Sequence, residues 1–287
     1  MNETMRVTKR SGALAVALAM TLSACGGPLP EDAENDAIAS EGAALKNGVP
    51  YNGGLIWRGT LKVEIFFERV QSWSTCSGQV VGKRAILTAA HCLTQVIADN
   101  GGYARVRVWR PTASGWLPVL PDVLSVFRIN PAYNNDMSAK YDVGLILAPT
   151  LQPLQNVTED DAALLSKSTP SGMAMTALGF GYYTDTAYGE ARSGVVTPTY
   201  NANPGALDYS FFSGTTQPWL CRGDSGGPLK TTTFQYGVTS LGTGPGSGPC
   251  RSQAHWAATA NNIPWIKSTI EMTGMECFDS STMLACW

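Results

Sequence analysis

Apolar and polar residues alternate in several short segments of the chain. Residues 61–67 (Leu-Lys-Val-Glu-Ile-Phe-Phe) largely follow this pattern, and residues 103–109 repeat it with valines between arginines. A period of two is typical of a half-buried strand. Residues 173–180 and 234–240 are further strand candidates. Short strands at such spacing, separated by glycine and proline, predict a β-barrel or a β-sandwich.

Two other segments depart from this pattern. Residues 148–170 carry prolines and polar residues with few strand signals, so they are interpreted as a connection between two halves of similar size. Near the C-terminus, Asn262 precedes Pro264, and Ile270 follows Ile266 by one helical turn. Asparagine as the N-cap and proline in the first turn predict one short helix here.

Composition agrees with a folded β protein. The chain has 287 residues, of which 44% are hydrophobic and 15% charged, a balance that argues against disorder. Its 30 glycines and 17 prolines favour short strands and turns over long helices. The net charge is −2 and no basic stripe is present, so nucleic acid is not an expected partner.

The first 24 residues are interpreted as an export signal. A basic start contains Arg6, Lys9 and Arg10, and residues 12–22 form an apolar run. That run is too short for a membrane-spanning helix, whereas its length suits a signal peptide. The segment is therefore set apart from the folded domain.

Residues 22–25 (Leu-Ser-Ala-Cys) resemble the bacterial lipobox, in which the cysteine is lipidated and becomes the mature N-terminus. Cleavage after Ala24 that leaves Cys25 unmodified is the alternative. Gly26 in place of an aspartate is compatible with transport to an outer membrane. We expect an exported protein, either an outer membrane lipoprotein, a cell-envelope protein or one released to the extracellular space. Residues 25–44 have the composition of an acidic linker or pro-segment.

Seven cysteines are present. When Cys25 is assigned to lipid, six remain, an even number that suits a protein exported to an oxidising compartment. Six cysteines allow many pairings, and composition does not choose among them. Only two histidines occur, far apart in the chain, so no metal site or cofactor is predicted.

Three separated segments carry residues suited to nucleophilic catalysis. They are residues 88–92 (Thr-Ala-Ala-His-Cys), 141–146 (Tyr-Asp-Val-Gly-Leu-Ile) and 221–228 (Cys-Arg-Gly-Asp-Ser-Gly-Gly-Pro). A serine hydroxyl is a weak nucleophile that needs a nearby base, and the base needs a third group to fix its tautomer. Taken singly, each segment also has a structural interpretation, such as a strand end or a glycine turn. The serine segment is the most specific of the three.

Together, in the order His, Asp, Ser, these segments resemble the trypsin/chymotrypsin-like serine proteases. The resemblance runs from about residue 45 to residue 272, and residues 178–181 (Leu-Gly-Phe-Gly) look like the family's Gly-aromatic-Gly element. It implies an all-β fold of two six-stranded antiparallel β-barrels with a short C-terminal helix. The histidine and aspartate would come from the first barrel and the serine from the second, with substrate in the cleft between them.

The resemblance also implies roles. Ser225 would attack the scissile carbonyl, His91 would transfer the proton, and Asp142 would orient the imidazole. The backbone amides of Gly223 and Ser225 would form the oxyanion hole, and the glycines would leave it unobstructed. The expected protein is a monomeric serine endopeptidase that acts on protein or peptide through an acyl-enzyme. It would meet a membrane only through a lipid at Cys25.

Two disulfides follow from the same resemblance. Cys76 would pair with Cys92 in the histidine loop, and Cys221 with Cys250 beside the substrate pocket. The third bridge, Cys277 to Cys286, is inferred by elimination. Residues 273–287 would then form a C-terminal tail with a disulfide loop. The second histidine, His255, is interpreted as a packed strand residue and not as a catalytic one.

Six residues are implied to form the substrate pocket: Trp219, Leu220, Ser240, Leu241, Gly242 and Ala254. Trp219 stands where trypsins carry an aspartate at the pocket floor, so a preference for Arg or Lys is disfavoured. The indole either makes the pocket shallow or points away from it. We expect a preference for small or medium apolar side chains.

Activation departs from the family pattern. Members usually mature by cleavage before an Ile-Val-Gly-Gly-like start, whose new ammonium group pairs with the aspartate before the serine. Asp224 occupies that position, but the best start, at Leu45 (Leu-Lys-Asn-Gly), matches poorly. Cleavage after Ala44 would separate the domain of residues 45–272 from its anchor.

Two other functions are compatible with parts of this sequence. One is a catalytically silent adhesin or scaffold on the same fold, which is disfavoured because all three triad residues and the adjoining glycines are present. The other is an esterase with the same mechanism, which is disfavoured because the family's cleft accommodates extended peptide.

Overall fold

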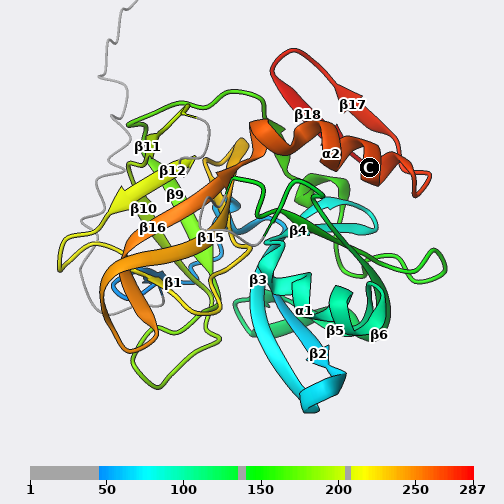
Figure 1. Cartoon of the computed structure of the whole chain (residues 1–287), viewed down its shortest axis with the longest axis horizontal. Helices are drawn as coiled ribbons and strands as arrows, with labels where there is room; N and C mark the ends of the chain where they lie inside the picture. Colours follow the sequence, from blue (N-terminus) through cyan, green and yellow to red (C-terminus); the bar gives the residue numbers. More distant parts are fainter. Residues whose placement is uncertain (1–44, 135–139, 204–207) are drawn as a thin grey trace, which may run out of the picture. The chain divides into compact units, whose positions relative to one another are not determined.

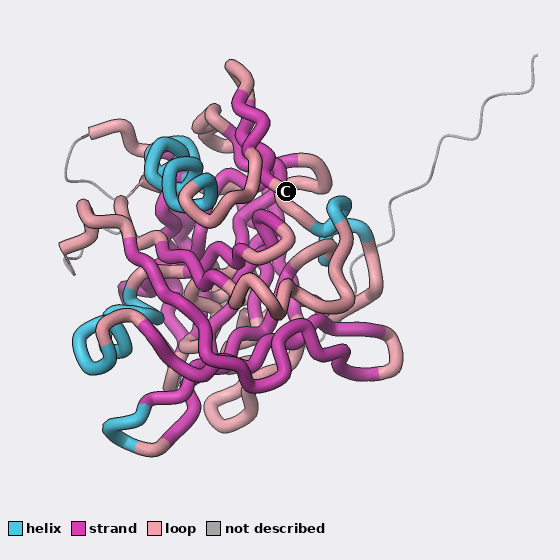
Figure 2. The backbone as a smooth tube through the Cα atoms, turned by 90° about the vertical axis from the view of Figure 1, so that its right-hand side faces the viewer, coloured by secondary structure: helices cyan, strands magenta, loops and turns pink. Residues whose placement is uncertain are grey.

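The computed structural model describes residues 45–134, 140–203 and 208–287. The export signal, Cys25 and the linker to residue 44 lie outside the described residues. Strands are the predominant regular element of the described backbone, and helices are confined to short segments (Figure 2). Within the described residues, no helix is both long and apolar enough to cross a membrane.

Six strands of the first half form a closed barrel in the order β2-β3-β4-β7-β6-β5 (Figure 1). They are β2 (Thr60–Phe67), β3 (Ser72–Gly82), β4 (Ala85–Thr88), β5 (Tyr103–Thr112), β6 (Gly115–Ile129) and β7 (Gly144–Leu147). Strand β2 shows why the alternation in sequence becomes a barrel wall. Leu61, Val63 and Ile65 are buried in the core, whereas Lys62 and Glu64 point outward and form an ion pair of 2.9 Å.

The second half is a sheet of twelve strands. Its central six run in the order β10-β9-β14-β15-β16-β12: β9 (Met175–Gly179), β10 (Arg192–Val196), β12 (Tyr209–Phe212), β14 (Pro228–Lys230), β15 (Phe234–Ser247) and β16 (Cys250–Ala258). Shorter strands extend them: β1 (Val49–Pro50), β8 (Leu164–Ser166), β11 (Thr199–Tyr200), β13 (Leu220–Cys221), β17 (Cys277–Asp279) and β18 (Met283–Cys286).

The all-β trypsin-like class is confirmed, with one difference in the second half. Among the described residues, β10 and β12 do not pair with each other, so hydrogen bonds do not close this sheet into a ring. Strand β1 pairs with Arg192 and Ser193 on the outer edge of β10, and β11 pairs with Tyr209 and Ser210 on the outer edge of β12.

The predicted C-terminal helix is confirmed as α2 (Thr259–Glu271), but its predicted N-cap is wrong. Asn262 lies inside the helix and is fully buried. Its Nδ2 donates to the carbonyl oxygens of Ala258 (2.8 Å) and Lys140 (3.1 Å), and its Oδ1 accepts a hydrogen bond from Asn130. The side chain therefore ties the helix to the loop before β7, and the helix begins four residues earlier than expected, with Ala258 as its N-cap.

A second helix, α1 (His91–Asn100), was not predicted. It buries Cys92, Leu93 and Val96 against the first barrel and ends at Gly101, whose φ of 62° is in the left-handed region. Three 3₁₀ turns complete the described elements: η1 (Leu55–Trp57), η2 (Glu68–Val70) and η3 (Glu159–Asp161).

The C-terminal tail is part of the sheet. Strands β17 and β18 form a hairpin, and β18 pairs with β8 from the connecting segment. Leu284 is fully buried and Cys286 is 5% exposed, both within the core cluster that includes barrel residues. Residues after 272 therefore contribute to the core.

Candidate active site

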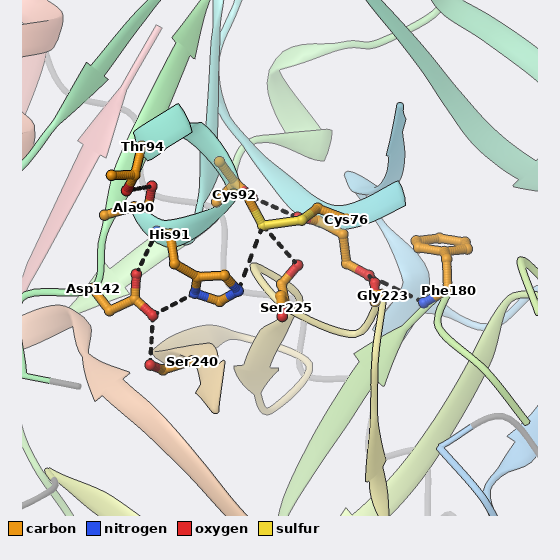
Figure 3. Close-up of a disulfide and its surroundings, with 12 residues drawn as sticks. Cys76, Ala90, His91, Cys92, Thr94, Asp142, Phe180, Gly223, Ser225 and Ser240 are labelled. Atoms are coloured by element: carbon orange, nitrogen blue, oxygen red, sulfur yellow. Dashed lines mark hydrogen bonds and ion pairs between the residues drawn. A yellow bond between two sulfur atoms is a disulfide. The ribbon is translucent and has the colours of Figure 1, made fainter. Parts of the chain in front are cut away.

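His91 and Asp142 lie together because of how β4 and β7 pair. Thr88 at the end of β4 is the partner of Gly144 at the start of β7, so the residues beyond these strand ends meet. His91 Nδ1 is 2.7 Å from Asp142 Oδ2, and the His91 backbone N–H donates to Asp142 Oδ1 at 2.8 Å (Figure 3). The carboxylate therefore holds both the ring and the backbone of the histidine.

Asp142 is 2% exposed and has a further partner from the second half of the chain. The Ser240 hydroxyl donates to Asp142 Oδ2 at 2.5 Å. These bonds fix the carboxylate, and the carboxylate places the imidazole proton on Nδ1. His91 Nε2 is left as the basic nitrogen.

Ser225 lies in the loop between β13 and β14, on the Nε2 side of the His91 ring (Figure 3). Its carbonyl oxygen accepts a hydrogen bond of 2.7 Å from the Ser77 backbone N–H in β3. Within the described residues, no hydrogen bond joins the Ser225 hydroxyl to His91. Nε2 is instead 3.9 Å from Cys92 Sγ. Catalytic hydrogen bonds of this kind often tighten only when substrate is bound.

Glycine is required on both sides of Ser225. Gly226 has a φ of +85°, and a Cβ atom there would lie 2.1 Å from Thr88 Oγ1. Gly223 has a φ of +96°, and a Cβ atom there would lie 2.7 Å from the Cα atom of Gly181. Within the described residues, the amide N–H groups of Gly223 and Ser225 have no acceptor, so both can bind a developing oxyanion.

Sequence reasoning did not find Ser77, which fastens this loop to the rest of the site. The Ser77 hydroxyl is fully buried, donates to the Gly223 carbonyl at 2.8 Å and accepts from the Phe180 N–H at 3.0 Å. Figure 3 shows Gly223 and Phe180 side by side. A lone serine after a cysteine gives no sequence signal for such a role, because its partners lie over 100 residues away.

Asp224 is fully buried beneath the same loop. Its carboxylate accepts hydrogen bonds from the backbone N–H groups of Gly181 (2.8 Å) and Cys221 (2.9 Å). Burial raises its pKa to about 7. Within the described residues Asp224 has no ion pair. It joins the serine loop to the strand end after β9.

A cavity of about 510 Å³ opens beside Ser225. Four of the six predicted pocket residues line it: Leu220, Ser240, Leu241 and Gly242. Trp219 and Ala254 do not. The indole of Trp219 donates to the Gly214 carbonyl at 2.9 Å, Lys46 Nζ lies 5.4 Å from its ring centroid, and the indole is not part of the cavity lining. Ala254 is 3% exposed and belongs to the core.

The lining includes residues that sequence reasoning missed: Tyr182, Asp185, Arg222, Gly248, Pro249 and Arg251. Asp185 lies in the segment between β9 and β10, and Arg251 is in β16. Because these positions are distant in sequence, only the folded chain reveals that they share a cavity.

The three disulfides join the cysteine pairs expected from the sequence. Cys76–Cys92 links β3 to α1 above the triad, Cys221–Cys250 links β13 to β16 at the cavity, and Cys277–Cys286 closes the terminal hairpin. His255 is buried, with Nδ1 2.9 Å from Ser210 Oγ and Nε2 2.7 Å from Thr243 Oγ1. Burial lowers the His255 pKa to about 4. Within the described part of the chain, no three His, Cys, Asp or Glu side chains group as metal ligands.

A family model described as Trypsin matches residues 46–266. The chain belongs to the trypsin family. This is a family of serine endopeptidases, hydrolases that cut peptide bonds in proteins or peptides. Mouse (Mus musculus) cathepsin G is 26% identical over 218 residues, which are 72% of this chain and 78% of cathepsin G.

Solved structures show the same fold. HL collagenase superposes with a TM-score of 0.58 at 20% identity, over 80% of this chain and 99% of the collagenase. An inactivated protease paralogue of the scabies mite superposes with a TM-score of 0.56 at 16% identity, over 78% of this chain and 99% of the paralogue. Since an inactivated protease also has the trypsin-family fold, catalysis depends on the individual side chains.

Proposed function

We propose that Ser225, His91 and Asp142 catalyse hydrolysis of peptide bonds through an acyl-enzyme. The observation that carries this proposal is the pair of hydrogen bonds from His91 to the buried Asp142 carboxylate, at 2.7 and 2.8 Å, with Ser225 on the opposite side of the ring. An oriented base beside a serine in a glycine loop is the arrangement that this chemistry requires.

In the first step His91 Nε2 takes the Ser225 hydroxyl proton while Oγ bonds to the substrate carbonyl carbon. The N–H groups of Gly223 and Ser225 stabilise the resulting oxyanion. The tetrahedral intermediate collapses, the C–N bond breaks, and imidazolium gives its proton to the leaving amine. Water then repeats the sequence on the acyl-enzyme, which releases the carboxylic acid and restores Ser225.

The position of β15 supports peptide as the substrate. Residues 240–242 line the cavity beside Ser225, and the register of β15 against β16 shifts between Thr239 and Gly242. By the family resemblance this segment pairs with the backbone of an extended peptide. An esterase would have no use for such a strand edge.

Cleavage of an intact protein substrate tests this function. The enzyme should generate new α-amino termini in unfolded casein, detected by amine labelling and mass spectrometry, whereas Ser225→Ala should generate none above background. A silent binding protein would retain casein without cutting it, and that result would contradict the proposal.

We further propose that the chain is a bacterial exported lipoprotein with its lipid at Cys25. The apolar run before residues 22–25 and the Leu-Ser-Ala-Cys sequence support this. The three disulfides fit an oxidising compartment. In a bacterial host fed an alkynyl fatty acid, wild type should carry label and Cys25→Ala should not. Equal labelling of both would contradict lipidation.

Maturation by cleavage after Ala44 is proposed for the same chain, and it would release a monomeric domain of residues 45–272 with its tail. Leu45 is 2% exposed within the second core cluster, and the Lys46 carbonyl accepts from the Trp219 N–H at 2.8 Å. The segment after the cut is thus already docked beside the serine loop. Intact mass of the active enzyme decides this, because full activity with residue 25 still attached would contradict obligatory cleavage.

A further inference from the structure

Charge is unevenly distributed in the cavity beside Ser225. Three charged side chains line it, Asp185, Arg222 and Arg251, and the remaining lining residues are uncharged. The cavity adjoins the nucleophile and the substrate-binding segment of β15. It therefore receives the side chain of the residue whose carbonyl Ser225 attacks.

The single carboxylate is offset by a neighbouring cation. Asp185 forms an ion pair with Lys46, with Oδ1 and Nζ 3.7 Å apart. It also lies close to Gly248, where an added Cβ atom would be 3.1 Å from its Oδ1. With Lys46 included, Asp185 contributes no net negative charge to the cavity.

Arg251 is held at the cavity wall. In the sheet it is the partner of Leu220 on β13 and of Gly246 on β15. Its Nη1 donates to the carbonyl oxygens of Gly248 (3.0 Å) and Cys250 (2.8 Å). An added Cβ atom on Gly246 would lie 2.5 Å from Nη1, so the glycine makes room for the guanidinium. Nε and Nη2 have no acceptor within the described residues.

Arg222 is fixed through its backbone and has a free side chain. Its N–H donates to the Pro249 carbonyl at 3.0 Å, and its carbonyl accepts from the Tyr182 N–H at 2.9 Å. It lies beside the Cys221–Cys250 disulfide and three residues before Ser225. Within the described residues, its guanidinium has no hydrogen-bond acceptor or ion-pair partner.

We propose that this cavity selects an acidic side chain, Glu or Asp, at the residue whose carbonyl Ser225 attacks. The inference rests on the proposed endopeptidase function. Two arginines with unused guanidinium donors line a cavity that contains no unpaired carboxylate. Guanidinium binds carboxylate with two parallel, charge-assisted hydrogen bonds. The apolar preference expected from Trp219 loses its basis, since the indole lies outside the cavity.

Matched peptide substrates that differ only at that residue test the proposal: Glu, Asp, Gln, Leu, Phe and Arg. The chain is purified from an exporting host, and active sites are counted with a fluorophosphonate. Since a hydrogen bond to a charged group contributes about 1.5–3 kcal/mol, kcat/KM for Glu should exceed that for Gln by about 10- to 100-fold.

Two variants and one control assign the effect. Arg222→Gln and Arg251→Gln should each lower the Glu-to-Gln ratio, and the double variant should bring the ratio close to one. Arg128→Gln removes the same charge from an exposed position on β6, where, among the described residues, the side chain donates only to the Phe127 carbonyl. That control should keep the wild-type ratio.

The outcomes separate the two proposals. Fluorophosphonate labelling with dominant cleavage after Leu or Phe would overturn acidic selection and leave the endopeptidase function standing. Dominant cleavage after Arg, abolished by Asp185→Asn, would also overturn it and would assign specificity to Asp185. Absence of both labelling and cleavage would overturn the endopeptidase function, and acidic selection with it.

Discussion

The two halves of the domain contribute to the site in different ways. The first half is a closed ring in which every strand has two neighbours, and it supplies His91 and Asp142 from the ends of paired strands. The second half is an open sheet extended by short strands, and it supplies Ser225 from a loop and the cavity from loops together with β13, β15 and β16. The pairing of β4 with β7 brings His91 and Asp142 together, and the Ser240 hydroxyl of the second half helps to hold the Asp142 carboxylate. The nucleophile instead depends on glycines, a disulfide and a buried carboxylate.

The second half also buries several ionisable side chains whose pKa values are shifted. There, burial raises the pKa of Asp208, Tyr209 and Asp224 and lowers the pKa of Lys230 and His255. Lys230 is 6% exposed, donates to the Arg58 carbonyl and to Gln79 Oε1 at 2.9 Å each, and has a pKa of about 7. Buried ionisable groups make stability depend on pH. We therefore expect the second half to dominate the pH dependence of folding.

The largest expected effect tests the first half. Asp142→Asn keeps the shape of the side chain but presents an amide to His91 Nδ1, which favours the wrong tautomer. Loss of kcat should be roughly 10⁴-fold, the size this change has in Ser-His-Asp triads. Steady-state kinetics on one peptide substrate measures it, with circular dichroism to check folding. A loss below about tenfold would contradict the assignment of Asp142.

The next largest expected effect tests Ser77, which links the two halves. Ser77→Ala leaves the Gly223 carbonyl and the Phe180 N–H unpaired, so the oxyanion donors lose their support. The expected result is a decrease in kcat of about 10- to 100-fold with KM nearly unchanged, since an unpaired buried group costs about 1–3 kcal/mol.

Thr88→Val is the matched control for Ser77. It removes another buried hydroxyl, one that donates to the Ser77 carbonyl at 2.8 Å and does not bond to Gly223. This variant should lose stability but bind a peptide aldehyde, which mimics the oxyanion, as wild type does. Equal weakening of aldehyde binding in both variants would show that Ser77 acts only through stability.

Removing one disulfide at a time distinguishes the role of the serine loop from that of the terminal hairpin. The Cys277–Cys286 bridge spans 9 positions and Cys221–Cys250 spans 29. Double replacement by alanine should lower the free energy of unfolding by about 2–3 kcal/mol for the hairpin bridge and about 3–4 kcal/mol for the loop bridge. Only the loop variant should change substrate preference, as measured with the Glu and Gln peptides. A changed preference in the hairpin variant would contradict this separation.

The smallest effect is a pH dependence. The His255 pKa of about 4 is below its usual 6.5, so between these values the unfolded chain binds more protons than the folded one. The stability that His255 contributes is complete above pH 6.5 and is lost as pH falls toward 4. Urea unfolding at pH 4.5 and pH 7 should therefore show a smaller acid loss in His255→Gln than in wild type.

Asp224 acts with the opposite sign and serves as the comparison. Its pKa of about 7 is above its usual 3.8, so its contribution is complete below pH 3.8 and is lost as pH rises toward 7. Asp224→Asn should remove that loss. If both variants changed the pH profile in the same direction, the environments described for these two groups would be wrong.

Much of the fold could be predicted because apolar and polar residues alternate along several of the strands. Residues 61–67 and 103–109 lie in β2 and β5, and residues 234–240 begin β15. Helix α1 was not predicted, although Leu93, Val96 and Ile97 recur at helical spacing and Gly101 follows its last residue. The pairing at the outer edges of β10 and β12 involves β1 and β11, two-residue strands that are too short to show a period.

The proposed site likewise contains features that the sequence predicts and features that it does not. The proposed triad of His91, Asp142 and Ser225 was predicted because each residue is surrounded by residues that the chemistry requires. The direction of the Trp219 side chain was not, since it is set by contacts with Gly214 and Lys46. Side-chain direction and long-range partners depend on the assembled fold, and local sequence does not encode them.

Labelling with a fluorophosphonate tests the central claim most directly, because it reports whether the base of the first half activates the serine of the second. Wild type should be labelled at one site, mapped by peptide mass spectrometry to Ser225. Labelling should be abolished in Ser225→Ala and slowed by several orders of magnitude in His91→Ala. Labelling at another residue, or equal labelling rates for wild type and His91→Ala, would contradict the account.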